Sequence, residues 1–229
     1  MAKEAGPAPV TPVRDGVALG LAVGVAGLAF GAAAASSGLS VGQACALSLL
    51  TFTGASQFAL TGTIAAGGSL VAGAASAVLL GSRNTLYSLR LAETLRVRGG
   101  RRLLAAQGVI DETTAITLAQ PEQRSARAAF WATFGTLYLT WNVATLAGAL
   151  GAGRVGSPQS FGLDVVGPAA FLALIWPRLR AGAAERGAGL LGAAIALSAT
   201  PFLPPGVPVI LAAAAALVVA LAGSRGGAP

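Results

Sequence analysis

Histidine is absent from the 229-residue chain, and cysteine occurs once, at Cys45. Histidine metal sites and histidine proton relays are therefore excluded. A single cysteine allows neither an intrachain disulfide nor a cysteine metal cluster. The sequence also lacks the G-x-x-x-x-G-K-[ST] pattern of nucleotide-binding loops, so nothing in it indicates ATP-driven chemistry. We expect neither a metal nor a cofactor.

Charge is scarce as well. Charged residues make up only 10% of the chain, against roughly a quarter in soluble domains. Hydrophobic residues make up 55% and are spread along the whole length, which excludes both a soluble globular enzyme and a disordered protein. The net charge of +7 does not indicate nucleic-acid binding, because most arginines lie in short gaps between apolar runs, as in the cytoplasmic loops of membrane proteins. The composition predicts a protein embedded in the lipid bilayer, with no nucleic-acid partner.

Apolar runs recur along the chain at about the 20-residue length that crosses a bilayer as a helix. We interpret residues 1–15 as a flexible tail, 16–223 as a single transmembrane domain and 224–229 as a C-terminal tail. The expected spans lie at 16–36, 41–66, 69–91, 128–150, 162–179, 187–203 and 208–223. The expected fold class is therefore all-α, a polytopic transmembrane helical bundle with about seven crossings.

The stretch 103–120 is ambiguous, because it is apolar at both ends but carries Asp111 and Glu112 in its middle. It is either an eighth span or a re-entrant or interfacial segment that does not cross. Arginines cluster at 90–102, at 178–186 and at Arg225, and all of these are expected on the cytoplasmic side. Seven crossings meet this condition if the N-terminus is outside, the C-terminus is inside and 103–120 does not cross.

Two segments of the chain resemble each other. Gly54-Ala-Ser-Gln-Phe58 matches Gly167-Pro-Ala-Ala-Phe171 in the spacing of Gly and Phe, and each follows one long apolar span. If the segments are equivalent, the chain holds two three-span repeats of opposite orientation, 16–91 and 128–203. Inverted repeats with interrupted helices are typical of secondary transporters. The alternative is a chance match in a chain rich in alanine and glycine.

Polar residues gather in the middle of the span 41–66, where Gly54 weakens the helix. A break there frees main-chain amides that suit a substrate carboxylate, whereas an intact helix with internally bonded hydroxyls is the alternative. In the span 128–150, a polar and aromatic stripe that includes Asn142 lies on one helical face. The candidate substrate-binding residues are Gly54, Ser56, Gln57, Phe58, Asn142, Pro168 and Phe171.

A basic side chain, Arg83, lies inside the span 69–91, where a charge costs about 2.5–3.5 kcal/mol. It either snorkels to the cytoplasmic surface or pairs with Asp111 or Glu112. Since the chain has no histidine, we expect a carboxyl group to carry any coupled proton. The candidate coupling residues are therefore Arg83, Asp111 and Glu112.

Glycines recur at a spacing of four in the first span, at Gly16, Gly20 and Gly24 and again at Gly27 and Gly31. Small residues at this spacing let two helices approach closely in lipid. We expect these glycines to pack against another helix rather than to contact a ligand.

Several short segments, taken in order, resemble the AzlC (azaleucine-resistance) family over about 16–220. They are Gly27-Leu-Ala-Phe-Gly31, Phe52-Thr-Gly-Ala-Ser-Gln-Phe58, Ser82-Arg-Asn-Thr-Leu-Tyr87, Asp111-Glu-Thr113, and Gly162-Leu-Asp164 with Pro168 and Phe171. The family's Asn-Leu-Arg-His motif reads Gly81-Ser-Arg-Asn84 here, so only its arginine is kept.

The resemblance implies a secondary-active exporter of branched-chain amino acids in the bacterial inner membrane, working with a small hydrophobic AzlD-type subunit. We expect coupling to the proton motive force and no enzymatic activity. Two alternatives remain open: an intramembrane enzyme that uses Asp111 and Glu112 as paired carboxylates, and an accessory membrane subunit without transport of its own.

Overall fold

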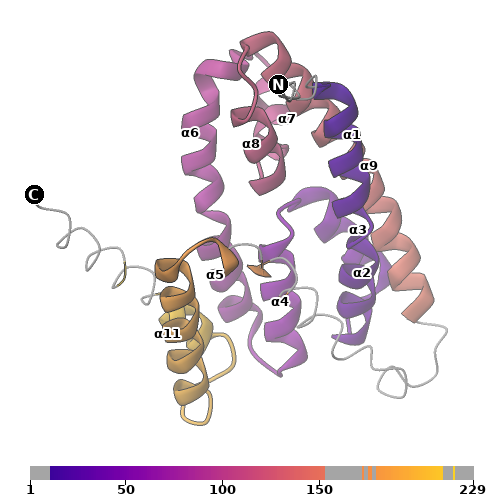
Figure 1. The fold of residues 1–229 in the computed structure, drawn as a ribbon. Coiled ribbons are helices and arrows are strands. Elements are labelled where there is room, and N and C mark those ends of the chain that lie inside the picture. Colours follow the sequence, from indigo (N-terminus) through magenta and orange to yellow (C-terminus); the bar gives the residue numbers. More distant parts are fainter. Residues whose placement is uncertain (1–10, 153–171, 173–174, 177–178, 214–218, 220–229) are drawn as a thin grey trace, which may run out of the picture. The chain divides into compact units, whose positions relative to one another are not determined.

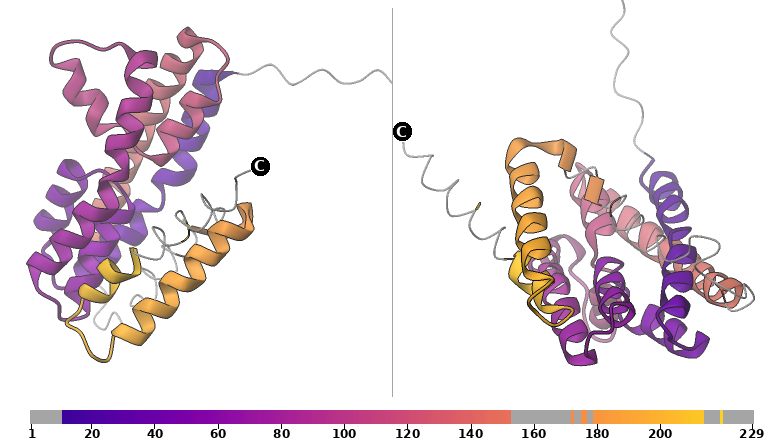
Figure 2. Two further views of the ribbon diagram at one scale, coloured as in Figure 1. Left: turned by 90° about the vertical axis from the view of Figure 1, so that its left-hand side faces the viewer. Right: turned by 90° about the horizontal axis from the view of Figure 1, so that it is seen from below.

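The computed structural model describes residues 11–152, 172, 175–176, 179–213 and 219. Every regular element in these ranges is helical, which agrees with the all-α expectation (Figures 1 and 2). The chain divides into two compact units, one made of Met1–Gly27 and Arg83–Ala144 and the other of Leu28–Ser82 and Thr145–Pro229. Helix α9 (Gln123–Ala152) contributes residues to both units.

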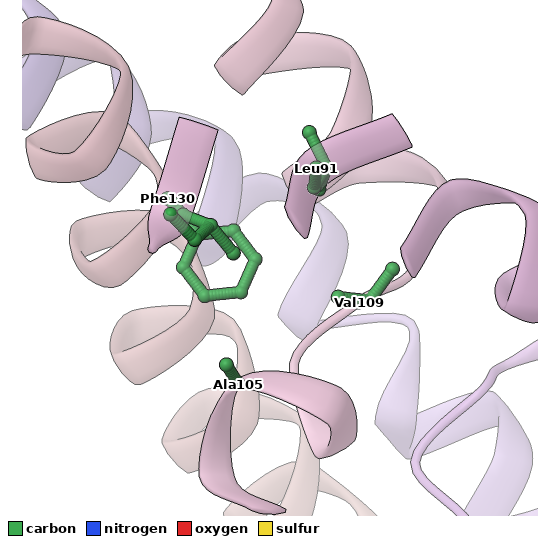
Figure 3. Packing of buried hydrophobic residues seen from close by; sticks show 5 residues of the cluster. Leu91, Ala105, Val109 and Phe130 are labelled. Carbon is green, nitrogen blue, oxygen red and sulfur yellow. The ribbon is translucent and has the colours of Figure 1, made fainter. Parts of the chain in front are cut away.

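The first unit contains α1 (Pro12–Gly24), α6 (Arg83–Leu95), α7 (Arg101–Gln107), α8 (Asp111–Leu118) and most of α9. Its core is a hydrophobic cluster from α6, α7 and its C-terminal flank, and α9 (Figure 3). Two side chains at the start of α9 reinforce this packing, since Gln123 and Arg127 donate to the carbonyls of Glu93 and Thr94 at the end of α6. The members of the cluster are Leu91, Leu95, Ala105, Val109 and Phe130.

Helix α1 packs along α9 through its glycines (Figure 1). Gly16, Gly20 and Gly24 are all buried. A Cβ atom on Gly20 would lie 2.8 Å from the Cβ atom of Thr136 and 2.9 Å from the main-chain nitrogen of Leu137. The expected close packing of this glycine series is therefore confirmed, because no larger side chain fits between the two helices.

The stretch 103–120 forms two short helices, α7 and α8, rather than one long helix. They have 7 and 8 residues, far below the roughly 20 that a crossing needs. Thr113 fixes the break between them, since its hydroxyl donates to the carbonyl of Gly108 and accepts from the amide of Ile110. The stretch is therefore not one long helix, and the re-entrant or interfacial segment stays a prediction.

The second unit contains α2 (Gly27–Ser36) from Leu28 onward, α3 (Val41–Leu50), α4 (Ala55–Ala65), α5 (Leu70–Gly81), the end of α9 and α11 (Ala183–Ala199). Helices α4 and α5 form a hairpin around Gly67, which has a φ of 76° (Figure 1). Ser69 caps α5 by accepting from the amide of Ala72. Figure 2 shows α11 as one uninterrupted helix.

A proline-rich turn follows α11 and packs on the hairpin of α4 and α5. The helix ends near Pro201 and helical structure resumes at residue 207. The Ser76 hydroxyl donates to the carbonyl of Gly206, and a Cβ atom on Gly68 would lie 2.8 Å from the carbonyl oxygen of Pro205. These contacts fix the turn to α5 and to the loop before it.

Only part of the predicted membrane topology is tested by the described residues. Among them, Pro12–Ser36 is the one stretch both long and apolar enough to cross a bilayer, and Val41–Leu50 is apolar but short. The span expected at 69–91 is divided at Ser82 into α5 and α6. The run 162–179 lies largely outside the described residues, so seven crossings and the two repeats stay predictions.

Candidate functional site

The span 41–66 is broken at the position where glycine predicted weakness. Helix α3 ends at Leu50 and α4 starts at Ala55. Gly54, immediately before α4, has φ 60° and ψ −85°, a conformation that side-chain-bearing residues avoid. Of the two alternatives for this span, the interrupted helix is therefore the one that the structure contains.

Gln57 joins the two halves of the broken helix. The residue is buried, with only 1% of its surface exposed. Its Nε2 donates to the carbonyl of Leu47 in the last turn of α3, at 3.2 Å. Its Oε1 accepts from the amide of Gly54, also at 3.2 Å. The side chain that sequence reasoning assigned to a substrate thus holds the main chain on both sides of the break.

The other residues at the break differ in their surroundings. Ser56 and Phe58 are buried, and the ring of Phe58 packs edge-on against Phe30 with the centroids 5.7 Å apart. The Thr51 hydroxyl donates to the carbonyl of Leu47. The Thr53 hydroxyl is buried and finds no hydrogen-bond partner among the residues that the structure describes. The break therefore contains a hydroxyl able to bond a ligand.

Helix ends expose main-chain groups that the helices themselves do not satisfy. The first amides of a helix and its last carbonyls lack partners within it. At this break the amides of Ala55, Ser56 and Gln57 belong to the start of α4, which is the positive end of that helix dipole. The last carbonyls of α3 belong to the negative end of the dipole of α3. An amino-acid zwitterion carries one group for each end, because the helix start favours a carboxylate and the helix end an ammonium group.

A second group of candidate residues lies in the first unit. Arg83, the first residue of α6, forms an ion pair with Asp111, the first residue of α8, with 2.5 Å between Nη2 and Oδ2. The Tyr87 hydroxyl donates to the other carboxylate oxygen of Asp111, at 2.7 Å. The predicted pairing of Arg83 with one of the two acids is confirmed, and Asp111 is that acid. Glu112 is partly buried beside it.

Tyr87 was not among the residues selected from the sequence. A signal for it existed, because residues four apart share one face of a helix and Arg83 precedes it by four. Ser48 was also missed. Its hydroxyl is fully buried and lies 3.2 Å from that of Thr145, near the end of α9. Nothing in the local sequence pointed to Thr145 as its partner, since 97 residues separate the two.

The remaining candidates are placed as follows. Asn142 belongs to the first unit, where its Nδ2 donates to the carbonyl of Tyr138 and its Oδ1 is buried without a partner among the described residues. Gly54, Ser56, Gln57 and Phe58 belong to the second unit. Pro168 and Phe171 lie outside the described residues.

Comparison with known proteins identifies the family. No curated protein and no solved structure shows a significant match to the chain. The profile described as AzlC protein matches residues 18–155, more than half of the chain. This range covers the broken helix, Arg83 and both acids. The chain therefore belongs to the AzlC family, a family of membrane proteins associated with the export of branched-chain amino acids.

Proposed function

We propose that the protein is a secondary-active exporter of leucine-like amino acids, coupled to the proton motive force across the bacterial inner membrane. The observation that carries the proposal is the break between α3 and α4, with Gly54 at positive φ and Gln57 bridging the two helix ends. Interrupted helices inside a membrane are tolerated where the freed main chain is covered by protein or lines a cavity. Transporters use such breaks to bind substrates.

The substrate is held at the break by main chain more than by side chains. The amides at the start of α4 bind the carboxylate, and the last carbonyls of α3 accept from the ammonium group. The unpartnered Thr53 hydroxyl supplies a further hydrogen bond. Gln57 acts as a positioning residue, since both of its polar groups engage the chain's own main chain.

Coupling resides in the group around Asp111. Arg83 and Tyr87 bind the two carboxylate oxygens of Asp111, which fixes this side chain in place. Adjacent residues on a helix point about 100° apart, so Glu112 faces a different direction. We assign the proton-carrying role to Glu112 and a structural role to Asp111.

The enzyme alternative has less support. Paired acid–base catalysis requires two carboxyl groups available to one substrate. Asp111 engages Arg83 and Tyr87 with its two oxygens, so the pair does not offer two such groups. No observation in the structure favours the alternative of an accessory subunit without transport.

Flux measured with purified protein in proteoliposomes tests the proposal. Vesicles loaded with leucine, isoleucine or valine should lose them faster than protein-free vesicles, and a pH gradient should change the rate. The measurement is made with the chain alone and with a small AzlD-type subunit, which we propose as its partner. Lysine and aspartate serve as control substrates, because a site for leucine-like side chains would have to bury their additional charge without a partner. Absence of leucine flux in both preparations would refute the proposal.

A further inference from the structure

A groove lies between α6 and α7 in the first unit, away from the ion pair of Arg83. Its volume is about 660 Å³, within the range of roughly 300–1,000 Å³ that is common for ligand sites. Its floor consists of apolar side chains that belong to the buried cluster shown in Figure 3. These floor residues are Leu91, Leu95, Ala105 and Val109.

Three arginines line the same groove: Arg96, Arg98 and Arg102. Two of them are held by their Nε atoms, because Arg96 donates to the carbonyl of Glu93 and Arg102 to that of Val97. These bonds use main-chain acceptors and leave the positive charges uncompensated. In the described part of the chain, none of the three forms an ion pair with an acid.

The exposed surface of α7 combines arginines with leucines. Leu103 is 78% exposed and Leu104 is 58% exposed, directly after Arg101 and Arg102. Exposed leucines beside arginines are typical of a segment at the boundary between acyl chains and lipid headgroups. A ligand that fits such a groove needs an anionic head and an apolar tail.

We propose that this groove binds an anionic phospholipid, with the phosphate at the three arginines and one acyl chain on the apolar floor. Guanidinium groups bind phosphate oxygens through paired N–H donors. Ala92, Val97 and Ala106 also line the groove and are not buried, so they give the acyl chain an apolar surface above that floor. A free phosphate ion would leave that floor unused, and a zwitterionic lipid would bring a cation next to the arginines. The proposal does not depend on which substrate the protein transports.

Lipid binding to the purified full-length chain tests the proposal. Phosphatidylglycerol and phosphatidylcholine with identical acyl chains are titrated separately, and bound lipid is counted by native mass spectrometry. The wild-type chain should bind phosphatidylglycerol roughly tenfold more tightly or better, as expected for several arginines near one phosphate. The double variant Arg98→Gln, Arg102→Gln should bring the two affinities close together. The double variant Arg90→Gln, Arg124→Gln removes the same charge from exposed positions outside the groove and should keep the wild-type preference.

A second pair of variants tests the apolar part and leaves the charges intact. Ala92 lines the groove, so Ala92→Trp should block the acyl chain and weaken binding of phosphatidylglycerol about tenfold. Leu89 lies on the same helix, is 70% exposed and does not line the groove, so Leu89→Trp should bind as the wild type does.

Four results would overturn the lipid site. The first is equal wild-type affinity for the two lipids, and the second is equal loss of preference in the two double arginine variants. The third is displacement of the lipid by inorganic phosphate at matched concentration, which would indicate a free-anion site. The fourth is loss of the small membrane subunit from the Ala92→Trp variant with lipid binding unchanged, which would make the groove a protein interface.

Discussion

Arg83 and Asp111 form an ion pair between the first residue of α6 and the first residue of α8, with 2.5 Å between their nearest atoms. Their side chains are 40% and 27% exposed, so the pair is partly open at the surface of the chain. Together with the bond from Tyr87, it fixes the start of α8 to one face of α6. This arrangement distinguishes Asp111 from its neighbour Glu112. We therefore expect substitution of Asp111 to affect stability and substitution of Glu112 to affect coupling.

Asp111→Asn should impair folding more than transport chemistry. The change removes the charge opposite Arg83 and weakens the bond from Tyr87, at a cost of about 1–2 kcal/mol for a partly exposed pair. The melting temperature in detergent should fall by several degrees. Asp15→Asn is the matched control, because Asp15 lies on the exposed surface of α1 and, among the described residues, its carboxylate accepts from Thr11 alone. Its melting temperature should stay near the wild-type value. Equal melting temperatures for the two variants would contradict the structural role.

Glu112→Gln should keep the fold and uncouple transport. A glutamine preserves the size of the side chain and can still form hydrogen bonds, but it carries no titratable proton. Leucine should still move down its own gradient in proteoliposomes, while an imposed pH gradient should no longer change the rate. Glu93→Gln, an exposed position on α6, serves as the control and should respond as the wild type does. A pH response that survives in Glu112→Gln would place the proton carrier elsewhere.

Gly20→Ala should destabilise the protein by separating α1 from α9. The added Cβ atom would lie 2.9 Å from the main-chain nitrogen of Leu137, so a helix has to move. Overpacking of this kind costs about 1–3 kcal/mol, which should appear as a lower melting temperature. Gly135→Ala on α9 meets nothing within 4 Å and should be neutral or slightly stabilising, since alanine favours a helix over glycine. The expectation fails if Gly20→Ala and Gly135→Ala have the same melting temperature.

Local sequence identified the features that depend on single residues. Gly54 predicted a weak point in 41–66 because glycine destabilises a helix, and the helix is broken there. Arg83 predicted an acidic partner because a charge in an apolar segment needs one, and Asp111 is that partner. The glycine series on α1 predicted close helix packing, and it is seen.

Features that depend on contacts between residues far apart in the chain could not be predicted from the sequence. The choice between Asp111 and Glu112 is set by where α8 meets α6, which no local pattern specifies. The need for glycine at position 108, which follows the last residue of α7, depends on Phe134, since a Cβ atom there would lie 2.6 Å from Cγ of that ring. The bridging of the break by Gln57 likewise depends on the carbonyl of Leu47, ten residues earlier.

The predicted orientation places the N-terminus outside the cell and the C-terminus and the arginine loop before α7 inside. In a Cys45→Ser background, single cysteines replace Ala8, Gly100 or Gly226, and intact cells are treated with an impermeant thiol reagent. The cysteine at position 8 should react, whereas those at positions 100 and 226 should react only after permeabilisation, because arginine-rich loops stay in the cytoplasm. Gly100 has open space around it, so the label meets no obstacle there. Labelling of position 226 but not position 8 in intact cells would contradict the predicted topology and indicate the opposite orientation.

Gln57→Ala should weaken leucine transport by changing the shape of the helix break. The loss leaves the Gly54 amide without this acceptor, at a cost of about 1–3 kcal/mol for a buried group, whereas the Leu47 carbonyl still accepts from Thr51. Because the two helix ends then shift, the KM for leucine should rise by roughly tenfold, the factor that 1.4 kcal/mol of binding energy represents.

Gln43→Ala provides the matched control for this change. Gln43 holds the corresponding position near the start of α3, where its Oε1 accepts from the amide of Ser40 at the exposed surface. Its loss should cost about 1 kcal/mol of stability and leave the KM unchanged. Gln57→Glu tests the two hydrogen bonds of Gln57 separately, because a carboxylate still accepts from the Gly54 amide but does not donate to the Leu47 carbonyl. An unchanged KM in a folded Gln57→Ala protein would remove the break between α3 and α4 from the substrate site.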